Sequence, residues 1–251
     1  ALRVYFALDN EDVTPALSRR KPGLVDAQQY AGFREILLEG AEGEAVATDD
    51  LAAADVIVYA SCRTNAVPAA RIAERVRTAG VPLYVTGEVL DPEVEALLPC
   101  VVGHGSLADF PERRRIVPGP EGTSLSRVGG YSDAEFAVFR SVRAKDGSTV
   151  HFAFENGCDA VVEGTCGKGR VLYSAVGLGT SFVPGKAARD AFFLRVLGHL
   201  TGRSFPERPY RNPRACVDGW FAGNDGFGHN GWTIGNGLLV ENVSDRLEVS
   251  N

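Results

Sequence analysis

The chain has 251 residues, of which 45% are hydrophobic and 23% are charged, and its formal net charge is −6. Such a chain is typical of a soluble globular protein with one large domain, or with a domain of about 200 residues and an appendage. The acidic balance argues against a nucleic-acid partner, because no excess of basic side chains is present to neutralise phosphates. No segment approaches the ~18 consecutive apolar residues that a membrane-spanning helix needs.

The cysteines and the chain ends indicate the setting of the protein. The five cysteines are scattered without a CxxC pair, and the opening residues, ALRVYFALDN, lack the regions of a signal peptide. Both features favour a reduced, cytoplasmic location. Methionine is absent, even at position 1, and residues 247–251 read as a strand without a closing element. We therefore expect the sequence to be a piece of a longer chain.

The first elements alternate between strand and helix. Residues 2–8 (LRVYFAL) predict a buried strand, because apolar side chains dominate the run. A long polar loop over residues 9–23 follows the strand. Residues 25–38 have the amphipathic pattern of a helix, and residues 44–48 predict a short strand.

Residues 55–89 read as strand, turn, helix, turn and strand. The run VIVY at 56–59 is apolar at every position, as in a strand buried on both faces. Residues 65–78 place apolar side chains on one side at helical spacing, and Gly80 is expected to end that helix. A second apolar run covers residues 83–85. Two buried strands joined through a helix predict a parallel βαβ unit with a right-handed crossover.

The second half of the chain predicts an antiparallel meander and a closing helix. Asp91-Pro92 is expected to cap a short helix at 93–98, and the glycine- and proline-rich residues 103–130 predict an irregular insertion. Asp-Gly at 146–147 and Asn-Gly at 156–157 are hairpin signals. The expected strands are residues 135–144, 148–155, 159–163 and 170–176, the last of them returning to the main sheet, and the closing helix spans residues 186–200.

Together these elements predict an α/β fold. We expect an open, mostly parallel, flavodoxin-like three-layer sheet with an antiparallel meander insertion and a small β appendage at the C-terminus. The α/β domain would cover residues 1–203, and a proline-rich linker residues 204–214. Residues 215–251 would form the small β appendage or the start of a β domain.

Cys62 is a candidate nucleophile. It follows a buried strand and precedes a helix, where amide N–H groups can stabilise a thiolate. A nucleophile elbow occupies such a place, but it needs glycine two residues to either side, and this chain has Ala60 and Thr64 there. The sequence therefore favours a structural role for Cys62, with catalysis as the alternative.

The histidines and the glycine-rich turn offer little local evidence for a site. The histidines are far apart in the sequence, and none stands at metal-ligand spacing from a cysteine or a carboxylate: His104, His151, His199 and His229. We expect His151 and His199 to be ordinary packing or surface residues, and we predict no metal and no cofactor. The run 164–169 lacks the spacer and the Ser/Thr of a phosphate loop and predicts a hairpin.

The C-terminal segment gathers aromatic and amide side chains. Trp220 and Trp232 stand near Asn224 and Asp225 in the sequence. Aromatic faces with hydrogen-bonding side chains suit a sugar ring, which makes a carbohydrate a candidate ligand. The simpler interpretation is that these large side chains anchor a small β element.

The order of these segments resembles a known family. DVIVYAS, GVPLYVTGEV and GCDAVVEGTCGKGRVLYSAVGLGTSF, followed by the helix RDAFFLRVLGHL, resemble the trimerisation domain of family 42 glycoside hydrolases, the β-galactosidases. That domain is a degenerate member of the class I glutamine-amidotransferase-like group, and the resemblance covers residues 1–203. It implies a non-catalytic module that packs subunits together beside a sugar-cleaving barrel. It also places the family's nucleophile position at about Gly87, with Glu88 beside it as a candidate base or, more simply, an exposed strand cap.

Three functions remain open on this evidence. The first is an assembly module, forming a homo-oligomer and associated with a carbohydrate-active enzyme such as a β-galactosidase. The second is a hydrolase or amidotransferase-like enzyme that uses Cys62 with one of the histidines. The third is a sugar-binding protein that uses the aromatic C-terminal segment. None of the three calls for nucleic acid or membrane as a partner.

Overall fold

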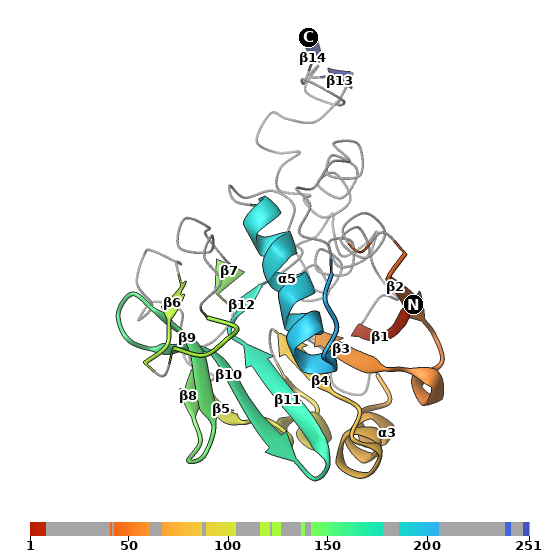
Figure 1. The fold of residues 1–251 in the computed structure, drawn as a ribbon, viewed down its shortest axis with the longest axis vertical. Helices are drawn as coiled ribbons and strands as arrows, with labels where there is room; N and C mark the ends of the chain where they lie inside the picture. Colours follow the sequence, from red (N-terminus) through yellow and green to blue (C-terminus); the bar gives the residue numbers. More distant parts are fainter. Residues whose placement is uncertain are drawn as a thin grey trace.

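A mixed ten-stranded sheet forms the body of the protein (Figure 1). The computed structural model describes residues 1–8, 41, 43–60, 67–86, 89–103, 116–120, 122–126, 137–138, 142–177, 186–205, 239–241 and 248–250. One half of the sheet is parallel and the other half is antiparallel.

The parallel half follows the order β2-β1-β3-β4-β11, and every neighbouring pair in it is parallel. Its strands are β1 (Leu2–Leu8), β2 (Ala45–Thr48), β3 (Val56–Ala60), β4 (Leu83–Thr86) and β11 (Gly169–Ser174). All residues of β3 and β4 are buried, because these central strands are covered on both faces. The predicted α/β fold, a parallel sheet with an antiparallel insertion, is confirmed.

The connection between β3 and β4 is helical, as the sequence predicts. α3 (Ala69–Glu74) continues as a π-helical turn, η3 (Arg75–Ala79), and Gly80 ends it in the left-handed conformation, with φ 73°. Ile72 and Val76 are fully buried, so the apolar side of this helix packs into the core. A short 3₁₀ helix, η2 (Leu51–Ala53), precedes β3.

The antiparallel half continues from β11 through β10 and β8 to β5, while β9 pairs with both β10 and β6. Its strands are β5 (Cys100–Val102), β6 (Ile116–Pro118), β8 (Val142–Ala144), β9 (Thr149–Phe154) and β10 (Asp159–Cys166). The predicted turn at Asp146-Gly147 forms, with Gly147 at φ 79°. The strands that it joins do not pair as a hairpin, however, because β8 pairs with β5 and β10.

The glycine-rich run at 164–169 is the hairpin between β10 and β11, as predicted, with Cys166 paired to Gly169. Gly167 adopts φ 60° at its tip. The backbone N–H of Lys168 donates to the carbonyl of Arg77 over 2.9 Å. The tip of the hairpin is therefore held against η3, beside the parallel half of the sheet.

The predicted closing helix is α5 (Lys186–Thr201), which lies across one face of the sheet (Figure 1). Phe193, Val196 and Leu197 are fully buried, and the ring of Phe193 lies 6.2 Å from that of Tyr84 on β4. Gly202, with φ 69°, follows the last helical residue. Hydrophobic burial against β3 and β4 therefore fixes the position of this helix.

Two details differ from the sequence-based prediction. α4 spans only Pro92–Glu95, and the Asp91 side chain does not cap it. Instead, Asp91 Oδ2 accepts a hydrogen bond from the Tyr59 hydroxyl over 2.8 Å, because burying that phenol requires a partner. The insertion at 103–130 is not wholly irregular, since it supplies strand β6 to the sheet.

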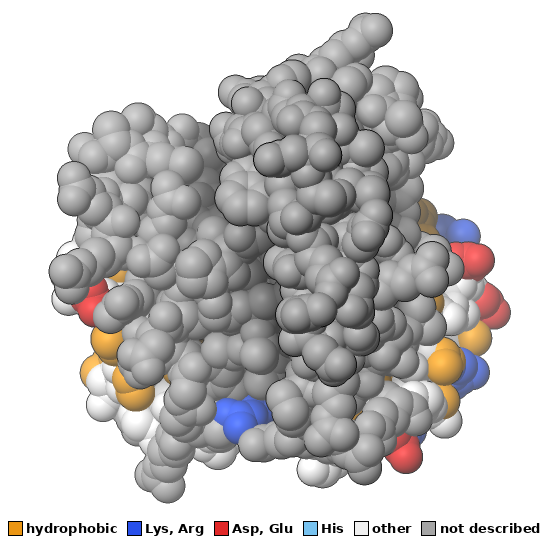
Figure 2. Space-filling view, turned by 90° about the horizontal axis from the view of Figure 1, so that it is seen from above, with side chains coloured by type: hydrophobic (Ala, Val, Ile, Leu, Met, Phe, Trp, Pro, Cys, Tyr) orange, Lys and Arg blue, Asp and Glu red, His pale blue; other side chains and the backbone are white. Residues whose placement is uncertain are grey.

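Further short ladders join β7 (Ala137–Val138) to β12 (Val176–Gly177) and β13 (Leu239–Glu241) to β14 (Glu248–Ser250). The predicted loop at 9–23, the helix at 25–38 and the linker at 204–214 lie wholly or largely outside the described residues. Among the described helices, none has the length and apolar character needed to cross a membrane. Along the rim of the face in Figure 2, acidic, basic and hydrophobic side chains of the described residues are interspersed.

Candidate functional site

The site residues predicted from the sequence lie outside the described residues: Cys62, Glu88, Trp220, Asn224, Asp225 and Trp232, as does Gly87. The carboxyl ends of β3 and β4 do lie side by side, with Tyr59 paired to Val85. The candidate roles of Cys62, Glu88 and the aromatic segment therefore stay predictions. The described residues instead bring together a group that we did not predict.

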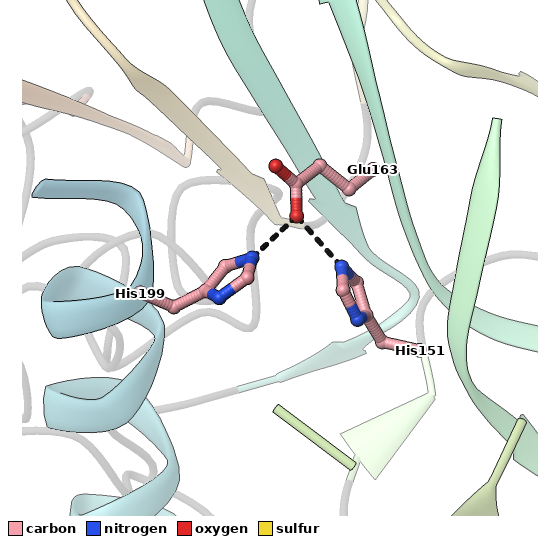
Figure 3. Close-up of side chains that lie close together, drawn as sticks. All are labelled: His151, Glu163 and His199. Atoms are coloured by element: carbon pink, nitrogen blue, oxygen red, sulfur yellow. Dashed lines mark hydrogen bonds and ion pairs between the residues drawn. The ribbon is translucent and has the colours of Figure 1, made fainter. Parts of the chain in front are cut away.

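Two histidines converge on one carboxylate oxygen, Oε2 of Glu163 (Figure 3). The Nε2 atom of His151 lies 2.7 Å from this oxygen, and that of His199 lies 2.5 Å from it. The two imidazole rings meet edge to face, with their centroids 5.0 Å apart. The sequence predicts ordinary packing or surface roles for both histidines, whereas in the fold they form one cluster with Glu163.

A β-bulge positions His151. Val161 pairs with Phe152 and Val162 pairs with Val150, so β9 supplies one residue more than β10 at this point, and that residue is His151. A bulge changes the direction of a side chain relative to simple strand alternation. Here it accompanies the approach of the His151 ring to Glu163 on the neighbouring strand. The carbonyl of His151 accepts a hydrogen bond from the N–H of Gly119 over 2.8 Å, which ties the bulge to the segment after β6.

Arg170 holds the other oxygen of the same carboxylate. On the β10–β11 ladder Thr165 pairs with Arg170, which places Arg170 diagonally opposite Glu163 on the same face of the sheet. Its Nε donates to Glu163 Oε1 over 2.7 Å. Its Nη1 donates to the carbonyl of His199 over 2.8 Å, at the last turn of α5. Arg170 therefore orients the carboxylate and also caps the C-terminal end of the helix.

A chain of hydroxyl groups supports His151 from the other side. Thr123 Oγ1 lies 2.6 Å from His151 Nδ1 and donates its own hydrogen to Ser126 Oγ over 3.2 Å. Ser126 Oγ in turn donates to the carbonyl of Thr123 over 3.0 Å. Because the hydroxyl hydrogen of Thr123 is used in this way, we assign the hydrogen of the His151–Thr123 contact to Nδ1.

The cluster is largely removed from solvent. The side chains of His151, Glu163 and His199 are 4%, 12% and 19% exposed, and that of Arg170 is 38% exposed. Burial by itself would raise the pKa of Glu163. Hydrogen bonds from His151 and His199, together with electrostatic interactions with His199 and Arg170, outweigh burial and hold that pKa far below its ordinary value. Glu163 is therefore a carboxylate at neutral pH.

Chemically, the cluster offers two imidazole nitrogens and one carboxylate oxygen, all within 4.8 Å of one another. Such a set can hold a cation, either a proton or a metal ion. His199 also lines a shallow open pocket of about 380 Å³, into which Arg195 and Arg203 contribute positive charge. No short motif links His151, Glu163 and His199, because they come from two strands and a helix that meet only in the folded chain.

Comparisons with known proteins support the fold. No family model matches the sequence, and no curated protein matches it. Among solved structures, the β-galactosidase from Rahnella sp. R3 is 17% identical, with a TM-score of 0.53 over 82% of this chain and 32% of that one. Gan42B, a GH42 β-galactosidase from G. stearothermophilus, is 13% identical, with a TM-score of 0.50 over 80% of this chain and 30% of that one. A cytoplasmic protein from Salmonella typhimurium LT2 is 17% identical, with a TM-score of 0.50 over 67% of this chain and 87% of that one.

These likenesses confirm the resemblance in fold between this chain and part of the GH42 β-galactosidases. This chain spans about a third of the length of each of those enzymes. At such low identity the likeness concerns the backbone alone.

Proposed function

We propose that this chain is an amidotransferase-like α/β module that assembles subunits and works together with a glycoside hydrolase, such as a β-galactosidase, without catalysing a reaction itself. The observation that carries the proposal is its match to part of a larger enzyme. Most of this chain, 82%, superposes on 32% of the β-galactosidase from Rahnella sp. R3. Its fold therefore corresponds to one module of such an enzyme.

One feature of the chain supports a role without catalysis, and a second supports assembly. β4 is a central strand of the parallel half, and the residue after its last one, Thr86, is glycine in the sequence. A glycine has no side chain that can attack a substrate, whereas a nucleophile at this strand end is what catalytic relatives of the resembled family would need. Exposed apolar side chains also stand on two of the outer strands of the sheet, which fits an assembly role: Val46 on β2 is 42% exposed and Val101 on β5 is 50% exposed.

The test is the oligomeric state of the purified chain. Sedimentation velocity and light scattering across micromolar concentrations are expected to show a homo-oligomer. Val46→Lys and Val101→Lys place a charge on one sheet edge each, and a variant that becomes monomeric would identify the edge at the interface. A monomer at every concentration would refute the assembly role.

The catalytic alternatives are tested on the same preparation. A chromogenic galactoside is expected to stay unhydrolysed by this chain alone. Iodoacetamide is expected to label Cys62 no faster than an exposed cysteine such as Cys158. Selective labelling of Cys62 at neutral pH would instead favour the hydrolase hypothesis, and quenching of Trp220 or Trp232 fluorescence by galactosides would favour sugar binding.

A further inference from the structure

We propose that His151, Glu163 and His199 bind a divalent transition metal ion, with zinc as the expected ion, between α5 and strands β9 and β10. The proposal does not depend on the assembly function. It rests on the identity of the three ligand atoms, on the hydrogens available to them, and on the residues that hold them in place.

The ligand atoms match zinc chemistry. Two neutral imidazole nitrogens and one carboxylate oxygen are the protein ligands of several zinc sites, which leave a further coordination position for water. Imidazole also favours zinc over magnesium or calcium, which prefer sites made of oxygen alone. Both histidines approach through Nε2, and both approach the same oxygen of Glu163.

The hydrogens at His151 leave a position for a cation. With the Thr123 hydroxyl donating to Ser126, the hydrogen of the His151–Thr123 contact is assigned to Nδ1. On a neutral ring with this tautomer, Nε2 offers a lone pair toward the Glu163 oxygen 2.7 Å away, and the hydrogen bond between them requires a proton that a metal ion can replace. Two lone pairs at that distance repel each other unless a positive centre stands between them.

His199 presents the same problem. Its Nε2 lies 2.8 Å from Arg170 Nη2, which can only donate, and 2.5 Å from Glu163 Oε2, which can only accept when ionised. A single ring nitrogen carries either one hydrogen or one lone pair in the ring plane, so it can hydrogen-bond only one of these neighbours, and Arg170 Nη2 otherwise keeps its ion pair with Glu163 Oε1. A metal ion that binds Nε2 of both rings and Oε2 satisfies all three atoms at once.

Binding requires a small expansion of the cluster. Tetrahedral zinc ligands at about 2.0–2.2 Å from the ion stand roughly 3.3 Å from one another, whereas the histidine nitrogens lie 2.5 and 2.7 Å from Oε2. The move is within reach, because His199 belongs to the last turn of α5 and is the most exposed of the three ligands. Arg170 would lose its contact with His199 Nε2 but keep Glu163 Oε1 and the His199 carbonyl.

The neighbours of the three ligands are those that a metal site needs. Metal-bound histidines usually donate their other N–H to a protein oxygen, and metal-bound carboxylates are themselves hydrogen-bonded. Thr123 serves His151 in this way, and Arg170 serves Glu163. His199 also lines a pocket that is open to solvent, so one of the three ligands borders a path by which an ion can approach.

The experiment is a titration of the metal-free full chain with Zn²⁺, followed by calorimetry, and with Co²⁺, followed by visible absorption. One equivalent is expected to bind and to raise Tm, because an ion that binds only the folded chain stabilises it. His151→Gln, Glu163→Gln and His199→Gln are each expected to weaken binding by about tenfold or more. Glu155→Gln, the same change at an exposed carboxylate, is expected to bind as the parent does.

Each possible result decides the question. Because His151 is buried, H151Q can fail to fold, so far-UV circular dichroism is recorded for each variant and the more exposed His199 carries the test. Absence of binding, or binding that persists unchanged in folded H199Q, overturns the proposal and leaves a proton as the only cation of the cluster. A Co²⁺ spectrum with thiolate bands also overturns it, because the ligands would then be cysteines.

Discussion

Replacing Glu163 by glutamine removes one negative charge and keeps the shape of the side chain. The carboxylate receives contacts from His151, His199 and Arg170. Breaking a fully buried ion pair costs about 3–5 kcal/mol, and a hydrogen bond to a charged group contributes about 1.5–3 kcal/mol. Arg170 is 38% exposed, so its pair is screened and contributes little, about 0–1 kcal/mol. A glutamine oxygen can still accept one hydrogen bond, which leaves an expected loss of about 2–3 kcal/mol.

The assay for Glu163→Gln is urea unfolding followed by circular dichroism, with EDTA present so that no metal contributes. An unchanged m-value with a lower midpoint would report a loss of stability alone. For a chain of this size the loss corresponds to a fall in Tm of roughly 4–12 °C. Glu155→Gln, the same change at an exposed carboxylate, is the control and is expected to have almost no effect. A loss below about 0.5 kcal/mol for Glu163→Gln would show that the contacts of the carboxylate do not stabilise the fold as argued.

Three further outcomes are expected. Gly169→Ala would place a Cβ atom 2.6 Å from backbone and side-chain atoms of η3. The urea midpoint should therefore fall by an amount equivalent to about 1–3 kcal/mol in unfolding free energy. An unchanged midpoint would contradict the close contact. The hydrogen bond from Arg3 lowers the pKa of Asp55 to about 2, from 3.8. The pair therefore stabilises the fold above pH 4, and this contribution disappears between about pH 4 and pH 2. Acid unfolding of Asp55→Asn should accordingly show a shallower dependence of stability on pH in that range. Burial raises the pKa of Cys100 to about 12, whereas Cys158 is exposed. A thiol reagent should therefore modify Cys158 in the native chain and Cys100 only after denaturation, and peptide mass spectrometry would identify the modified residues.

The parallel half of the fold could be predicted from the sequence because its signals are local. The run at 56–59 is apolar at every position and forms the buried strand β3. Gly80 ends the helix that follows it, as the left-handed residue after η3. The hairpin at 164–169 was predicted for the same reason, since its glycines mark the turn. Such features depend on neighbouring residues and on the spacing of apolar side chains, and both can be read from a single sequence.

The cluster could not be predicted in this way. The orientation of His151 accompanies an extra residue in β9 relative to β10, and a bulge leaves no mark in the alternation of apolar side chains. His199 reaches Glu163 only because α5 packs on the sheet through Phe193 and its neighbours. The pairing of β8 with β5 depends likewise on which strands meet in space, whereas the Asp-Gly turn before β9 indicates only that the chain turns there.

The pairing of β4 with β11 has a consequence for how the chain folds. These adjacent parallel strands, with Leu83 opposite Val171, are separated in the sequence by the whole antiparallel half of the sheet. The edge of β4 therefore stays unpaired until a long segment has been synthesised and ordered, and closing so long a loop is slow. During that interval β4, which carries no charged residue, is open to pairing with other chains. A chain ending before residue 169 would expose this edge permanently, and production of the protein should depend on the second half arriving intact.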